Sequence, residues 1–130
     1  MKAHEFLAGV QRRGNYANPA EAEVATRAVL RVLSTRLTGN EARDLASQVP
    51  QPLDEELRGR DDRTADGDFG VSEFVQRVAD QIGTDETAAR THTEAVLATI
   101  AETVTGGQLN HILTQLPSGY AALFGRAELS

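Results

Sequence analysis

Residues 62–73, reading Asp-Arg-Thr-Ala-Asp-Gly-Asp-Phe-Gly-Val-Ser-Glu, have a spacing that could bind calcium. They align with the calcium-binding loop of an EF-hand, in which Gly67 takes the position that requires glycine. The candidate ligands, at loop positions 1, 3, 5, 7 and 12, are Asp62, Thr64, Asp66, Asp68 and Glu73. Because calcium prefers about six to eight oxygen ligands, these side chains and the Asp68 carbonyl could surround one ion.

The same residues have a second interpretation as an acidic, solvated linker. Thr64 is a poor substitute for Asp or Asn at position 3, and Gly59 opposes a helix leading into the loop. In this interpretation Gly70 caps a helix that begins at Val71, and Glu73 is the third residue of that helix. The sequence favours the linker and keeps calcium binding as the alternative.

The three histidines offer little further chemistry. His92 lies on an apolar helical face, which predicts a tucked, hydrogen-bonded side chain, whereas His4 and His111 are predicted to be exposed. No pair of histidines has metal-ligand spacing, and no nucleophile elbow, phosphate loop or dinucleotide fingerprint occurs. An enzyme site built from His92 and Glu94 is a less favoured alternative.

Composition narrows the class of protein. The chain has 130 residues, enough for one domain with its own core, and it contains no Cys, which excludes disulfides and thiolate metal sites. Its net charge of −6 opposes binding to nucleic acid, and no apolar run predicts a membrane span or a signal peptide. We therefore expect a cytoplasmic protein. The abundance of Ala and Arg, with one Lys, is typical of a bacterial source.

The chain repeats itself with an offset of 68 residues, then 67. The matched segments are Glu5-Phe6-Leu7 with Glu73-Phe74-Val75, Ala28-Val29-Leu30 with Ala95-Val96-Leu97, Thr38-Gly39 with Thr105-Gly106, and Gln48-Val49-Pro50 with Gln115-Leu116-Pro117. These matches predict one domain over residues 1–130, made of two copies at 2–58 and 71–125 and an acidic linker at 59–70. Equivalent residues meet near a pseudo-twofold axis, which raises the hypothesis of an Arg27–Glu94 ion pair. The favoured alternative is that both residues are solvated on an outer face.

Each copy reads as three to four helices and no strand. In the first copy Asn18-Pro19 and Thr38 begin helices, Pro50 ends one, and residues 52–57 form a short fourth helix. The helix from residue 19 to about 37 carries a broad apolar stripe that includes Val24, so we expect it to be central and buried. In the second copy Gly83 ends a helix, Thr84 or Asp85 caps the next, and Thr105 with Gln108 repeats the capping box. Ser118 caps the last helix.

The chain resembles a bacterial family catalogued as domain of unknown function 2267. The resemblance rests on the Glu-Phe-x-x-x-Val opening, the Ala-Val-Leu centre and the ending from Ala46 to Pro50, and it extends over about residues 2–125. It implies a small all-helical bacterial protein, and it implies no activity, cofactor or catalytic residue.

The sequence thus predicts an all-α helical bundle of two tandem, pseudo-twofold related copies. The function that we expect is a non-enzymatic interaction with an unknown protein partner or a second copy of the chain, through grooves between helices. The alternative function is a calcium-binding or calcium-stabilised module that uses the loop at 62–73.

Overall fold

A computed structural model describes residues 1–58 and 67–126, and this part of the chain is all-helical, as predicted. Its helices are α1 (Ala3–Gly14), α2 (Pro19–Arg36), α3 (Gly39–Ala46), α4 (Glu55–Arg58), α5 (Val71–Ile82), α6 (Glu86–Thr103), α7 (Gly106–Thr114) and α8 (Gly119–Leu123). The two halves have helices of the same order and nearly the same lengths: 12, 18, 8 and 4 residues against 12, 18, 9 and 5.

The predicted capping residues set most of these boundaries. Asn18 accepts a hydrogen bond from the Glu21 amide at 3.0 Å and Asp85 accepts one from the Ala88 amide at 2.8 Å, so each long helix begins at a side-chain cap. Thr38 forms the predicted capping box with the third residue of α3. Gly83 ends α5 with φ of 79°, in the left-handed region that favours glycine.

Two of the predicted capping interactions differ from those in the structure. The Thr105 amide donates to Oε1 of Gln48, at 2.9 Å, instead of to Gln108, so the end of the first half caps a helix of the second. The Thr105 side chain still accepts from the Gln108 amide at 3.1 Å. Ser118 stands at the start of α8 but makes no side-chain cap. The fourth helix is also shorter than predicted, since α4 begins at Glu55.

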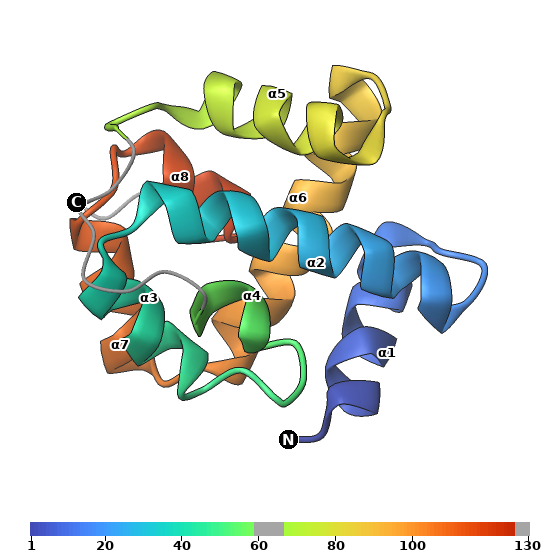
Figure 1. Cartoon of the computed structure of the whole chain (residues 1–130), viewed down its shortest axis with the longest axis horizontal. Helices are drawn as coiled ribbons and strands as arrows, with labels where there is room; N and C mark the ends of the chain where they lie inside the picture. The colour runs from blue at the N-terminus through green and yellow to red at the C-terminus, as the bar shows by residue number, and fades with distance from the viewer. Residues whose placement is uncertain (59–66, 127–130) are drawn as a thin grey trace.

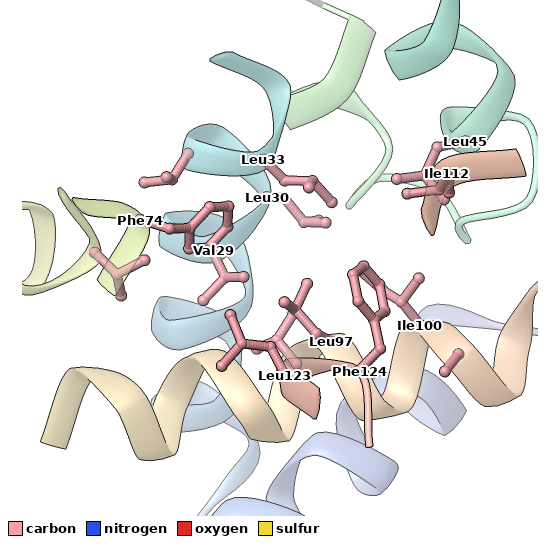
Figure 2. Packing of buried hydrophobic residues seen from close by; sticks show 14 of the residues in the cluster. Val29, Leu30, Leu33, Leu45, Phe74, Leu97, Ile100, Ile112, Leu123 and Phe124 are labelled. Atoms are coloured by element: carbon pink, nitrogen blue, oxygen red, sulfur yellow. The ribbon is translucent and has the colours of Figure 1, made fainter. Parts of the chain in front are cut away.

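The long helices α2 and α6 contact each other at the centre of the molecule (Figure 1). Helix α1 packs against both of them, and α5 does the same, while α4 packs on α2 and α8 on α6. Figure 2 shows Val29, Leu30 and Leu33 of α2 directed toward Leu97 and Ile100 of α6. All five are fully buried, so α2 is the central helix that the sequence predicted.

Val24 is an exception to the predicted stripe, because its side chain is 59% exposed. Helical periodicity places Val24 beside Ala28, but it does not predict which parts of the stripe other helices cover. Within the described residues, the only other exposed large apolar side chain is Met1.

The hypothesis of an Arg27–Glu94 ion pair is wrong. Arg27 donates to Glu23 at 2.9 Å and to Glu56 at 2.8 Å, while Glu94 pairs with Arg90 at 3.4 Å. Each half therefore carries an ion pair within its own long helix. In the first half the acid precedes the arginine along the chain, and in the second half the arginine precedes the acid. Glu56 also accepts from Arg31 at 2.9 Å, which ties α4 to the outer face of α2.

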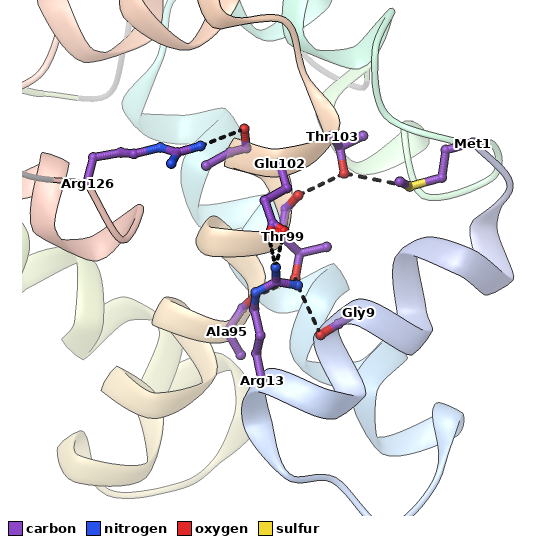
Figure 3. Close-up of polar contacts among 9 residues, drawn as sticks. Met1, Gly9, Arg13, Ala95, Thr99, Glu102, Thr103 and Arg126 are labelled. Carbon is purple, nitrogen blue, oxygen red and sulfur yellow. Dashed lines mark hydrogen bonds and ion pairs between the residues drawn. The ribbon is translucent and has the colours of Figure 1, made fainter.

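Helices α1 and α6 approach closely at Gly9, as Figure 3 shows. A Cβ atom on Gly9 would lie 3.2 Å from Cγ2 of Thr99 and 3.2 Å from a guanidinium nitrogen of Arg13. That guanidinium donates to the Thr99 hydroxyl at 3.2 Å and forms an ion pair with Glu102. The contact thus depends on the absence of a side chain at residue 9.

We expect Gly9→Leu to lower the free energy of unfolding by about 1–3 kcal/mol, the usual cost of overpacking a filled contact. Denaturant unfolding measures this change. Gly107→Leu is the matched control, because a Cβ atom on Gly107 meets nothing within 4 Å and leucine favours a helix over glycine. Equal stability of Gly9→Leu and the unmodified protein would contradict the close α1–α6 contact.

Candidate functional site

The structure describes two of the five candidate calcium ligands. Asp62, Thr64 and Asp66 lie outside the described residues, and Asp68 is exposed. Glu73 accepts two hydrogen bonds from Arg77 of the next helical turn, at 2.6 and 3.0 Å, and its side chain does not cap α5. Helix α5 does begin at Val71 after Gly70, as the linker interpretation predicted. Calcium binding stays a prediction.

The linker is anchored where it enters α5. The carbonyl of Phe69 accepts from Nε of Arg36 at 2.9 Å and from the hydroxyl of Tyr120 at 2.8 Å. Arg36 is only 5% exposed, and its guanidinium lies against the rings of Phe69 and Tyr120, at 5.6 and 5.7 Å from their centroids. This buried polar contact holds the second half against the end of α2, and we assign it a structural role.

A small pocket lies where α2, the end of α5 and α6 meet the loop after α1. Its volume is about 260 Å³, and it is lined by Tyr16, Glu21, Val24, Ala25, Ile82 and His92. The residues come from both halves, so the pocket belongs to neither half alone. Most of its lining is apolar, with Glu21 as its carboxylate.

Tyr16 and His92 form the aromatic wall of the pocket. Their rings are stacked, with centroids 5.4 Å apart and an angle of 12° between the planes, and the tyrosine hydroxyl is hydrogen-bonded to Nδ1 of His92. His92 is half-buried and hydrogen-bonded, as its position on an apolar helix face predicted. His4 and His111 are exposed, also as predicted.

The turn after α1 fixes the position of Tyr16. Asn15 takes a left-handed conformation, with φ of 56°, and the Tyr16 amide donates to the Gln11 carbonyl at 3.0 Å. The tyrosine ring folds back over Gly14, where an added Cβ atom would lie 2.2 Å from the ring. Any larger residue at position 14 would therefore displace the ring.

Burial moves the pKa values of Tyr16 and His92 away from pH 7. It raises the pKa of Tyr16 to about 12, helped by the negative charge of Glu21, and it lowers the pKa of His92. Both groups are neutral at pH 7. Glu94, which the enzyme hypothesis placed with His92, is not a lining residue of this pocket and pairs with Arg90.

A larger depression of about 760 Å³ lies over α7, but its charged groups are already engaged. Arg126 donates to the Ala101 carbonyl at 3.2 Å, and Glu102 pairs with Arg13. Glu21 differs, because its side chain has no ion pair or hydrogen bond within residues 1–58 and 67–126. The smaller pocket is therefore the candidate site.

Sequence reasoning missed the partners of His92. Tyr16 stands in a loop, where helical periodicity predicts nothing, so the sequence indicates no role for it. The available signal was an aromatic residue two positions after the end of a helix, beside Gly14, in a chain with two tyrosines.

The described residues define a small all-helical protein with a pocket between its two halves. No described helix is long and apolar enough to cross a membrane. The chain belongs to the family described as an uncharacterized conserved protein, DUF2267, whose sequence model matches residues 3–123, so the predicted resemblance is confirmed. No curated protein matches the chain.

Acid should destabilise the protein partly through His92. Because burial lowers the folded-state pKa of His92 from 6.5, the unfolded chain binds a proton more tightly. The stability contributed by neutral His92 is complete above pH 6.5 and is lost as the pH falls through the folded-state pKa. We expect His92→Gln to lose less unfolding free energy than the unmodified protein between about pH 7.5 and pH 5.

Denaturant unfolding at the two pH values measures this difference. His111→Gln is the control, since His111 is exposed, and it should keep the full dependence on pH. If the unfolding free energy of His92→Gln depended on pH as strongly as that of the unmodified protein, His92 would not have the half-buried environment described above.

Proposed function

We propose that this protein is a non-enzymatic protein-interaction module of the bacterial cytoplasm. In this proposal the pocket formed by Tyr16, Glu21, Val24, Ala25, Ile82 and His92 receives a side chain of a partner protein. The observation that carries the proposal is the exposed apolar side chain of Val24 at the edge of a small apolar pocket.

The size of the pocket supports a side chain as the occupant. Its volume of about 260 Å³ is close to the lower limit of the range of about 300–1,000 Å³ that is usual for small-molecule and cofactor sites, and it is enough for one side chain. Interfaces between proteins gain most of their affinity from a few anchors that enter well-packed pockets. An apolar pocket beside an exposed valine fits that pattern.

The acid–base properties of the pocket support binding over catalysis. A general acid or base works best when its pKa is close to the working pH. Here the pKa of Tyr16 is raised to about 12 and the pKa of His92 is lowered, so both shifts lead away from pH 7.

We also propose that the two halves are related by a pseudo-twofold axis through this site. The reciprocal packing of α1 on α6 and of α5 on α2 supports this relation. So does the position of Leu45 beside Ile112, which is its equivalent in the repeat (Figure 2). Ala25 and His92 are also equivalent and both line the pocket. Divergence of the copies at the axis would then make the pocket asymmetric.

Site-specific photo-crosslinking in the source cell tests the proposed function. A photoreactive amino acid at Val24 should form a covalent adduct with a partner protein, because the side chain would lie at the edge of the interface. The same amino acid at His111, which is exposed on α7, is the control and should not form that adduct.

Mass spectrometry of the adduct identifies the crosslinked protein. An adduct with a second copy of this chain would show that the partner is that second copy and that the protein forms a homodimer. Absence of any adduct specific to Val24, or identical adducts from both positions, would contradict the proposed docking site.

A further inference from the structure

Glu21 is exposed, and it is the one carboxylate among the described residues that line an otherwise apolar pocket. Its amide is used by the Asn18 cap, but its carboxylate has no ion pair or hydrogen bond in the described part of the chain. The neighbouring glutamate on the same helix, Glu23, is by contrast paired with Arg27. A carboxylate beside apolar and aromatic walls favours a ligand that combines an alkyl stem with a positive charge.

The other walls suit the stem of such a ligand. Val24 and Ile82 offer apolar contact to an alkyl stem. No Lys or Arg is among the lining residues described, so nothing there competes for Glu21. The net charge of −6 on the whole chain also favours the approach of a basic partner.

We propose that the pocket binds a basic side chain, lysine or arginine, of the partner protein. The alkyl stem lies against Val24 and Ile82, and the charged end pairs with the Glu21 carboxylate. This inference rests on the proposed function, because it names the anchor that the docking site receives.

Nuclear magnetic resonance titration of the intact protein tests the inference with four small probes. Two are cationic, N-acetyl-arginine amide and N-acetyl-lysine amide, and two are their neutral counterparts, N-acetyl-citrulline amide and N-acetyl-norleucine amide. We expect the cationic probes to give saturable shifts of the Val24 and Ile82 methyl groups and the His92 ring. The neutral counterparts should bind more weakly by a factor of up to about five, because they lack one partly exposed ion pair.

Three variants locate the interaction. Glu21→Gln keeps the shape of the pocket and should weaken the cationic probes to the level of the neutral ones. Glu86→Gln is the matched control, since Glu86 is an exposed acid at the start of α6 that lies outside this pocket, and it should change nothing. Gly14→Ala should weaken all the probes, because it displaces the Tyr16 ring.

Equal affinity for charged and neutral probes, or no effect of Glu21→Gln, would overturn the basic anchor. So would the absence of saturable shifts with every probe. These results leave crosslinking through Val24 unaffected, so failure of the basic anchor is distinguishable from failure of the docking site. If both experiments fail, the proposed function fails with them.

Discussion

The packing of α2 against α6 is the contact on which the rest of the structure depends. Val29 and Leu30 on one helix, and Val96 and Leu97 on the other, are fully buried. A helix that is apolar on most sides is stable in water only when other elements cover it. Here α1 and α5 each cover both long helices, so each half supplies part of the core of the other. A half of this length has little core of its own.

The pocket follows from the same arrangement. Its lining comes from the loop after α1, from α2, from the end of α5 and from α6, which meet only because the halves pack together. Val24 is exposed and lines this pocket together with Ile82, the last residue of α5. A pocket at such a junction can change its chemistry through a few residues while the central packing stays the same. The carboxylate of Glu21 and the ring of Tyr16 are two such residues.

The sequence predicted the helices well because their signals are local. Asn18, Thr38, Gly83 and Asp85 act within one helical turn, and the structure confirms each of them. Two errors are local, since Ser118 makes no cap and α4 begins at Glu55. The others lie in contacts between distant segments: one partner of Arg27 and the partner of the Thr105 amide are Glu56 and Gln48, which no local pattern identifies. The apolar setting of His92 could be predicted from helical periodicity, whereas its contact with Tyr16 could not, since that contact joins residues 76 apart.

Separation of the two halves tests the central claim, that each half folds only against the other. Chains covering residues 1–62 and 63–130 should each be largely unfolded by circular dichroism. Mixed in equal amounts, they should regain the helical signal, together with a nuclear Overhauser contact between the rings of Tyr16 and His92. If either half proved fully helical alone, with cooperative unfolding, the packing of α2 on α6 would not be the contact on which the fold depends.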